Sequence, residues 1–336
     1  MTAFNTYDEA VNQALGQKNL LVGNGLSIAF SDNFKYAKLF DAANFEDNNP
    51  KIAAIFKALN TKDFETVAGA ILIARNISHE LGNDDFAKEL DQKIEELKNN
   101  LIEAVKNTHP EDKNCVTDDQ CKNIQKFLSS FFEDEGCVYS LNYDALLYWA
   151  LLRWFTNSPT KGKFADGFGA PDNGSVHFLG DMCPKPVNFL FPHGALFLFE
   201  ENGDVLKPQA VIKEKKLLEI ITDSMEQGSF PLFVSEGSHS QKLKAIRKSF
   251  YLNYAFEKIG TAKENFFIFG HSMDLASDGH IIEKIFRNDE IKNIYASFNS
   301  SRDAIEGKLL QLRAHVNRDD SNLKLHTYPA STVLCW

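Results

Sequence analysis

The stretch Leu20-Leu21-Val22-Gly23-Asn24-Gly25-Leu26-Ser27-Ile28 decides the fold that the sequence predicts. Its apolar run is too short for a helix and suits a buried strand. Two glycines follow, which allow the backbone to turn tightly and to approach a ligand without Cβ clashes. A helix beginning at Leu26 or Ser27 would direct free N–H groups into the same gap, where they attract phosphate. The pattern is typical of the entry to a dinucleotide site, although Gly-Asn-Gly also forms ordinary loops.

The composition excludes several classes of protein. With 336 residues, 43% apolar and 24% charged, the chain can form one large globular domain or two small ones. No apolar run reaches about 18 residues and no signal peptide precedes the first strand, so we expect a cytoplasmic protein without a membrane span. The net charge of −10 argues against a nucleic-acid surface. The five cysteines are scattered without a Cys-x-x-Cys pair, which suits a reducing compartment and disfavours a four-cysteine zinc site.

Residues 31–133 are predicted to form an all-helical subdomain inserted after the first strand–turn unit. Apolar residues recur at helical spacing in Lys51–Leu59, Phe64–Ile77 and Phe86–Val105. The polar stretch Asn107–Cys121 is interpreted as a loop. Residues 1–30 and 134–336 then remain for a Rossmann-like domain. The helical block can serve as a packing layer, a lid or an oligomer surface, and the sequence does not choose between these roles.

The second half of the chain predicts a mainly parallel sheet. Strands are expected at Cys137–Leu141 and Asn188–Phe191, with a long loop at 157–187 between them and a hairpin arm of Leu196–Phe199 with Val205–Leu206 after them. Helices at 213–226, 239–259, 279–287 and 301–314 then alternate with strands at 232–234, 266–269, 294–298 and 323–327. Such alternation indicates an α/β fold, a Rossmann-like and mostly parallel sheet with helices on both faces.

Polar clusters follow these strands where each strand ends. Ligands bind beyond the carboxyl ends of the strands in such sheets, so the repetition itself predicts a site. The clusters are Gly23-Asn24-Gly25, Asn142-Tyr143-Asp144, His193-Gly194, Ser235-Glu236-Gly237, Gly270-His271-Ser272 and Asn299.

In this order the clusters resemble the motifs of the sirtuin-like superfamily. Gly23-Asn24-Gly25-Leu26-Ser27 is similar to its first glycine motif, and Ser140-Leu141-Asn142-Tyr143-Asp144 to its Thr-Gln-Asn-x-Asp motif. His193-Gly194 resembles the pair that carries the catalytic base. Ser235-Glu236-Gly237 lies where sirtuins have a Gly-Glu turn, and Gly270-His271-Ser272 and Asn299 resemble motifs near the adenosine ribose.

The resemblance is closest to the zinc-less, bacterial sirtuin-like proteins of anti-phage defence, which hydrolyse NAD. The chain has neither the two Cys-x-x-Cys pairs nor the Gly-Ile-Pro-Asp-Phe-Arg stretch of protein-deacylating sirtuins. Asp278-Gly279-His280-Ile281-Ile282 also resembles the defence branch. The resemblance implies an NAD glycohydrolase (NADase) that works as a homo-oligomer or beside an infection-sensing partner.

The candidate residues divide into a catalytic pair and a binding set. Asn142 can hold a water against the anomeric carbon, and His193 can act as the base. The binding set consists of Gly23, Asn24, Gly25, Ser27, Asp144, Gly270, Ser272 and Asn299. NAD is expected as the substrate, with no metal and no nucleic-acid partner.

Each assignment has a structural alternative. His193 can be a turn residue between Pro192 and Gly194, and Asn142, Asp144, Ser27 and Ser272 can be helix N-caps. His239, His271 and His280 hint at a metal, but no carboxylate or cysteine pattern in the sequence fits them. The alternatives at the level of function are a sirtuin-type deacylase, an ADP-ribosyltransferase, or a non-catalytic sensor of NAD or an ADP-ribose derivative.

Overall fold

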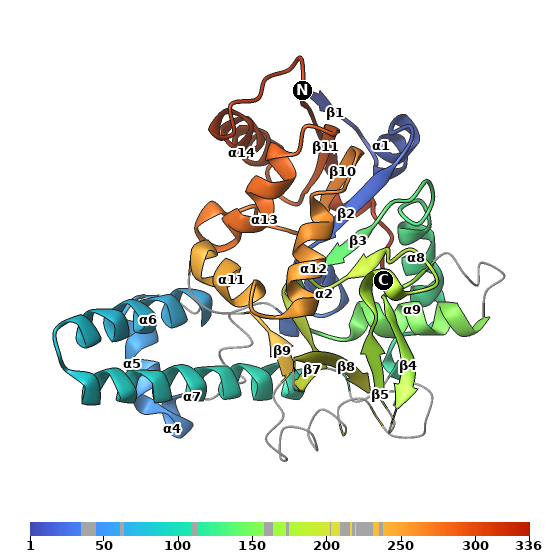
Figure 1. Ribbon diagram of the computed structural model, residues 1–336. Coiled ribbons are helices and arrows are strands. Elements are labelled where there is room, and N and C mark those ends of the chain that lie inside the picture. Colours follow the sequence, from blue (N-terminus) through green and yellow to red (C-terminus); the bar gives the residue numbers. More distant parts are fainter. Residues whose placement is uncertain are drawn as a thin grey trace.

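The structure is a computed structural model (Figure 1). It describes residues 1–34, 45–60, 64–108, 110, 113–157, 164–172, 175–201, 203–208, 216, 219, 231–234 and 238–336. The helix predicted at 213–226, apart from Lys216 and Glu219, and the cluster Ser235-Glu236-Gly237 lie outside the described residues.

The main sheet confirms the predicted α/β class. Every strand pair in it is parallel, and its order in the described part of the chain is β1-β12-β11-β10-β2-β3-β6. The strands are β1 (Thr2–Ala3), β2 (Lys18–Val22), β3 (Val138–Ser140), β6 (Phe189–Leu190), β10 (Glu264–Phe269), β11 (Ile291–Phe298) and β12 (Lys324–Pro329). Without β1, the order from β6 to β12 is 3-2-1-4-5-6, that of dinucleotide-binding Rossmann sheets. The order reverses between β2 and β10, and ligands bind at such a point.

Side chains of β10 alternate between two helical layers. Phe266 stacks on Tyr139 of β3, whose hydroxyl donates to the Lys258 carbonyl of α12 (Phe250–Ile259). The next residue, Phe267, lies on the opposite face against α1 (Tyr7–Gln13), and Phe269 there contacts Phe127 of α8 (Asp118–Ser129). Both faces are therefore apolar, as a parallel sheet covered on two sides requires.

A second, antiparallel sheet accompanies the first (Figure 1). It has the order β4-β5-β8-β7-β9 and consists of β4 (Phe168–Asp172), β5 (Ser175–Phe178), β7 (Gly194–Glu201), β8 (Asp204–Pro208) and β9 (Pro231–Phe233). The hairpin predicted around Asn202-Gly203 is confirmed as β7 and β8. The loop predicted at 157–187 is wrong in part, because β4 and β5 lie within it. The strand predicted at 232–234 was expected in the parallel series, but β9 pairs antiparallel with β7.

Between residues 31 and 133 the described backbone forms helices and 3-10 turns and no strand. Its α-helices are α4 (Phe45–Asn48), α5 (Pro50–Ala58), α6 (Phe64–Glu80), α7 (Asp84–Thr108) and α8. The helices α6 and α7 form a hairpin that extends from the body, whereas α8 packs on the main sheet (Figure 1). The loop predicted at Asn107–Cys121 is too long, since a capping box at Thr117 begins α8.

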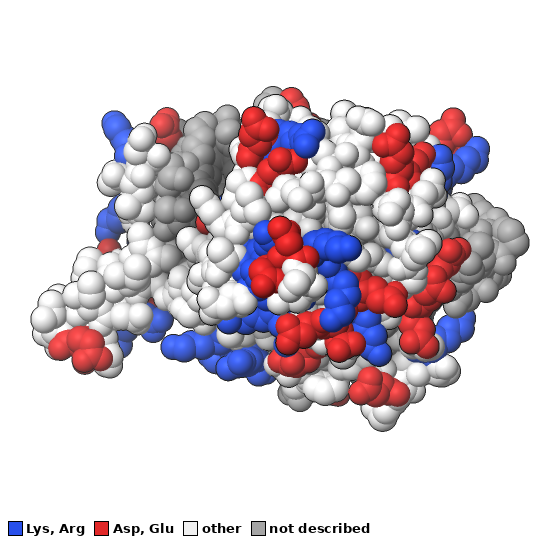
Figure 2. Space-filling view, turned by 90° about the horizontal axis from the view of Figure 1, so that it is seen from above, with Lys and Arg blue, Asp and Glu red and all other residues white. Residues whose placement is uncertain are grey.

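The last helices are close to their predicted positions. The helix predicted at 239–259 is divided into α11 (His239–Ile246) and α12, and α14 spans Arg302–His315. The helix α13 spans Leu275–Arg287 and loses helical geometry at Asp278, where φ is −125° and ψ is 21°. No described helix is long and apolar enough to cross a membrane. On the described part of the face in Figure 2, basic and acidic side chains lie next to one another.

Candidate functional site

Two glycine turns meet where the strand order reverses. Gly23 follows β2, Gly270 follows β10, and the N–H of Gly25 donates to the Gly270 carbonyl over 2.8 Å. A Cβ added to Gly25 would lie 2.5 Å from the Gly270 Cα, and one added to Gly23 would lie 2.8 Å from the His271 Cβ. Gly270 also has a φ of +64°, which strains any other residue. These glycines are required because the two turns pack backbone against backbone.

This packing changes the expected role of the first turn. The N–H groups of Gly23 and Leu26 donate to the Phe269 and Gly23 carbonyls, so together with Gly25 three of the donors predicted for a phosphate are already bonded. The Asn24 side chain donates to the Phe34 carbonyl over 3.0 Å. Space for a pyrophosphate was the expected reason for Gly25, but a Cβ at this position meets the chain itself.

Three of the predicted site residues form one hydrogen-bonded chain. Ser27 lies in α2 (Gly25–Phe30), and Asn142 and Asp144 lie between β3 and α9 (Leu146–Asn157). The Asn142 Nδ2 donates to the Ser27 Oγ over 2.9 Å, and this hydroxyl donates to the Asp144 Oδ2 over 2.5 Å. All three side chains are buried. These hydrogen bonds join the segment after β2 to the segment after the adjacent strand β3.

The capping alternative applies to Asp144 and not to Asn142. The Asp144 Oδ1 accepts a hydrogen bond from the Leu146 N–H at the start of α9, as an N-cap does. The Asn142 side chain points to Ser27 instead. Asn142 therefore keeps a carbonyl oxygen that is not needed to begin the helix.

His193 lies at the junction of the two sheets. It follows β6 of the main sheet, and the next residue, Gly194, begins β7 of the second sheet. Gly194 has a φ of +77°, and a Cβ there would lie 2.0 Å from the Leu232 carbonyl oxygen. The His193 carbonyl accepts from the Val234 N–H over 2.9 Å. The turn explains why residue 194 is a glycine. It does not explain why residue 193 is a histidine with only 2% of its surface exposed.

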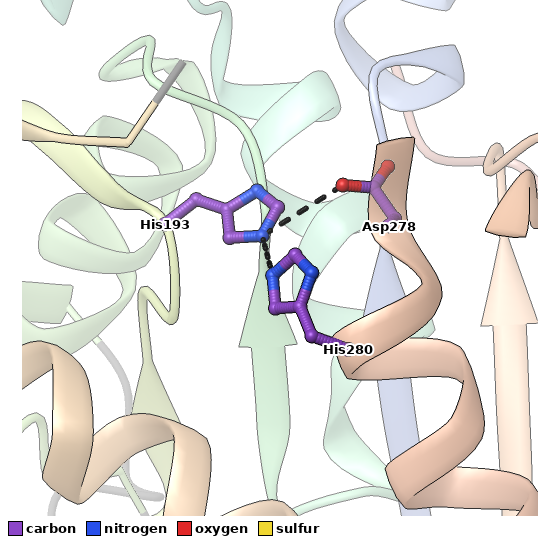
Figure 3. A group of neighbouring side chains, drawn as sticks. All are labelled: His193, Asp278 and His280. Atoms are coloured by element: carbon purple, nitrogen blue, oxygen red, sulfur yellow. Dashed lines mark hydrogen bonds and ion pairs between the residues drawn. The ribbon is translucent and has the colours of Figure 1, made fainter. Parts of the chain in front are cut away.

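The His193 imidazole belongs to a buried cluster with α13 (Figure 3). Its Nε2 lies 3.0 Å from the His280 Nε2 and 3.8 Å from the Asp278 Oδ1. The Asp278 Oδ1 also accepts from the Lys242 Nζ over 3.1 Å, and its Oδ2 lies 3.0 Å from the His271 Nε2. Because the His271 Nδ1 accepts from the Met273 N–H, its Nε2 carries the proton and donates to Asp278.

Burial sets the protonation of this cluster. It holds the pKa of His193 well below its ordinary value, with the Asp278 charge acting in the opposite direction. Burial likewise lowers the pKa of His280 to about 3, again against Asp278. Burial alone would raise the pKa of Asp278, but the His271 hydrogen bond and nearby positive charge keep it below its usual range. Both histidines are therefore neutral at pH 7, and Asp278 is ionised.

Contacts to the backbone connect the histidine cluster with the hydrogen-bonded group of Ser27, Asn142 and Asp144. Tyr143, next to Asn142, donates from its hydroxyl to the Val234 carbonyl over 2.7 Å, and the Val234 N–H bonds His193. On the other side, Gly23 packs against His271. Ser27, Asn142 and Asp144 thus form one group of predicted residues, and His193 lies in a neighbouring group.

Two predicted binding residues lie apart from these groups. The side chains of Ser272 and Asn299 are exposed, and in the described part of the chain neither bonds another site residue. Ser297, two residues earlier in β11, is the residue that bonds the second glycine turn, because its Oγ accepts from the Gly270 N–H over 3.1 Å.

Sequence reasoning missed Asp278 and Lys242. It dismissed a metal because no carboxylate accompanied the histidines, yet His193, Asp278 and His280 place ligand atoms within 4.8 Å of one another. The sequence does place a carboxylate near a histidine, in Asp278-Gly279-His280, but this stretch was considered only for its resemblance to the sirtuin-like defence proteins. Nothing in the sequence pointed to Lys242, since a single lysine in a polar helix is normally expected on the side that faces solvent.

A cavity of about 620 Å³ lies elsewhere, on the hairpin of α6 and α7. Leu72, Arg75, Asp91 and Asn99 are among its lining residues. It includes none of the residues of the glycine turns or of the histidine cluster.

The fold and these groups define a Rossmann-like α/β protein with polar residues gathered at the switch point of its parallel sheet. The chain belongs to the family described as a domain of unknown function, DUF4917, whose profile matches residues 20–336. No curated protein matches the chain.

Proposed function

We propose that this protein binds NAD at the carboxyl ends of β2, β3 and β10 and hydrolyses it to ADP-ribose and nicotinamide. One observation carries the proposal: a buried histidine and a buried Ser27–Asn142–Asp144 chain lie beside the point where a 3-2-1-4-5-6 sheet reverses its order. The resemblance to sirtuin-like NAD-hydrolysing proteins supports the choice of substrate.

The proposed reaction requires the protein to position one water and to accept one proton. Water adds to the anomeric carbon of the nicotinamide ribose, nicotinamide leaves as a neutral molecule, and the water releases one proton. The leaving group needs no general acid, and the transition state resembles an oxocarbenium ion, as in glycoside hydrolysis. A base that is neutral at pH 7 can accept the proton even though its pKa is low, because the water attacks a strongly electrophilic carbon and becomes acidic as the new C–O bond forms.

Each residue then has a defined task. The Asn142 amide, fixed by its bond to Ser27, holds the ribose or the water through its carbonyl oxygen. His193 accepts the proton, and His280 fixes the ring through the 3.0 Å contact between the two Nε2 atoms. Activity in anti-phage defence, as an oligomer or beside a sensing partner, is part of the proposal and rests on the resemblance alone.

The test is incubation of the purified protein with NAD, followed by chromatography of the products. We expect ADP-ribose and nicotinamide in equal amounts, and a loss of about 10²–10⁴-fold in turnover for His193→Ala. His315→Ala is the matched control, because His315 is an exposed histidine of α14. NAD binding without products would favour the sensor, and wild-type turnover by a folded His193→Ala protein would exclude His193 as the base.

A further inference from the structure

The group formed by His193, His280 and Asp278 has the donors of a metal site. Two imidazole rings and one carboxylate come from two separate elements, the turn between β6 and β7 and the kinked start of α13 (Figure 3). Two imidazoles with one carboxylate are a ligand set that suits Zn²⁺ and neighbouring divalent transition metals.

The distances fit an ion of this size. A tetrahedral Zn²⁺ with bonds of about 2.0–2.1 Å holds its ligand atoms roughly 3.3–3.4 Å apart. The His193 Nε2 is 3.0 Å from the His280 Nε2 and 3.8 Å from the Asp278 Oδ1, and the ligand atoms of all three lie within 4.8 Å of one another. Small side-chain movements would bring them to bonding distance.

The surroundings of the three side chains support the same conclusion. His271 donates to the Asp278 Oδ2, as groups behind a ligating carboxylate do. In contrast, the buried His280 Nδ1 has no partner in the described part of the chain, so on ligation through Nε2 its proton would lack the acceptor that usually stands behind a metal-bound imidazole. His280 is 95% buried, because only 5% is exposed, so water does not readily satisfy this atom.

Lys242 opposes a cation at this place. Its ammonium is fully buried and lies 3.1 Å from the Asp278 Oδ1. A bound ion must displace this ammonium from the oxygen or share the oxygen with it. Lys242 is therefore a competitor of the ion, and its removal provides a test that a purely structural cluster would not pass.

We propose that His193, His280 and Asp278 bind one divalent transition-metal ion, Zn²⁺ or a close analogue, in competition with the Lys242 ammonium. When both Nε2 atoms ligate, the contact between the two rings is lost, and each neutral ring carries its proton on Nδ1. A water completes the coordination. Because the ion occupies His193, it inhibits NAD hydrolysis, a consequence that rests on the proposed function.

The experiment titrates the chelator-treated full-length protein with Co²⁺ and follows the visible absorption of the ion, with circular dichroism as the folding check. We expect one Co²⁺ per chain, displaced by Zn²⁺. Binding should be lost in His280→Ala and unchanged in His315→Ala. His271→Ala should weaken it about 10–100-fold, the usual effect of removing a group behind a ligand.

Lys242→Met should raise the affinity for Co²⁺, whereas His280→Ala and His271→Ala lower it. Removing the positive charge that lies 3.1 Å from the Asp278 Oδ1 should tighten binding about tenfold or more. Absence of Co²⁺ binding by the wild type, binding that survives in a folded His280→Ala protein, or weaker binding in Lys242→Met overturns the proposal. If His280→Ala does not fold, His193→Gln replaces it with the same expected loss.

Reversible inhibition of NAD hydrolysis by Zn²⁺ is measured separately. Co²⁺ binding by a protein that does not hydrolyse NAD would uphold the metal site and reject the proposed function. NAD hydrolysis by a protein that does not bind Co²⁺ would uphold the proposed function and reject the metal site.

Discussion

Gly25 and Gly270 meet backbone to backbone where the chain leaves β2 and β10. The Gly25 N–H donates to the Gly270 carbonyl over 2.8 Å, and a Cβ on Gly25 would lie 2.5 Å from the Gly270 Cα. Since the strand order reverses between these two strands, the contact fixes both turns beside the proposed dinucleotide site. The first glycine motif is thus a packing motif, and it can act on a ligand by positioning the two turns.

We predict that Gly25→Val lowers both the stability of the protein and its affinity for NAD. The added side chain collides with backbone, which cannot move aside as a flexible side chain would, so the turns must separate. Thermal melting and calorimetry with NAD measure the two effects.

Gly307→Ala is the control for this substitution. Gly307 lies on the exposed side of α14, and a Cβ there meets nothing within 4 Å. We expect this variant to gain roughly 0.5–1 kcal/mol, because glycine is unfavourable inside a helix. A wild-type melting temperature for Gly25→Val would show that the contact between the turns is not required.

We predict that Asn142→Asp loses about 1–3 kcal/mol of stability as well as NAD turnover. An ionised Asp cannot donate to the Ser27 Oγ, and it adds a second carboxylate next to Asp144 on the same hydroxyl. Urea unfolding and product chromatography measure the two losses.

Asn299→Asp makes the same chemical change at an exposed position after β11. Its stability should equal that of the wild type, and its NAD affinity reports whether Asn299 contacts the ligand. If Asn142→Asp unfolds at the wild-type urea concentration, the hydrogen bond to Ser27 contributes nothing and the network described for Asn142 is unimportant.

Apolar runs predicted every strand of the main sheet except β1, because buried parallel strands are continuous apolar runs. Leu20–Val22 and Phe266–Phe269 are such runs, and both are paired strands in the structure. The run 232–234 looks the same, yet it pairs antiparallel with β7, because three apolar residues do not specify a partner. The strands β4 and β5 were missed since the Gly, Pro and Asp residues of β4 are those of a loop, and the apolar face of the hairpin comes from Phe168 and Phe178.

The site was predictable where its residues directly follow strands. Ser27, Asn142 and Asp144 come from two adjacent strand ends, and the structure brings them together. Lys242 and Asp278 lie at helix positions that reach His193 only through the packing of α11 against α13. No local pattern in the sequence encodes that packing, so this half of the site required the structure.

We predict that the proposed NAD hydrolysis persists below the pH range in which an ordinary histidine titrates. Burial lowers the pKa of His193, so the ring remains a neutral base as the pH falls through about 6.5. The acid limb of kcat/KM should therefore lie below that value. In Asp278→Asn it should lie lower still, because the Asp278 charge raises the His193 pKa. An acid limb at pH 6.5 or above in the wild type would mean that His193 is not the titrating base.

We predict that the free energy of unfolding falls as the pH decreases below about 6.5. Burial depresses the pKa of His193, and it lowers those of His280 and His326 to about 3 and about 4. Between these values and the unfolded value near 6.5, the unfolded chain binds more protons, so stability rises with pH and is lost on acidification. Each such histidine contributes a slope of up to about 1.4 kcal/mol per pH unit.

Urea unfolding at pH 7, 6 and 5 measures this slope in the wild type and in His280→Leu, a variant that removes one proton-binding group but retains an apolar side chain. We expect a shallower slope for His280→Leu than for the wild type, and His315→Ala, which removes an exposed imidazole, is measured beside it for comparison. Equal stability of the wild-type protein at pH 7 and pH 5 would contradict the burial of neutral histidines at the junction of the two sheets. A shallower slope in His280→Leu alone would assign the effect to the ring that contacts His193, because the two variants differ in whether the lost imidazole is buried.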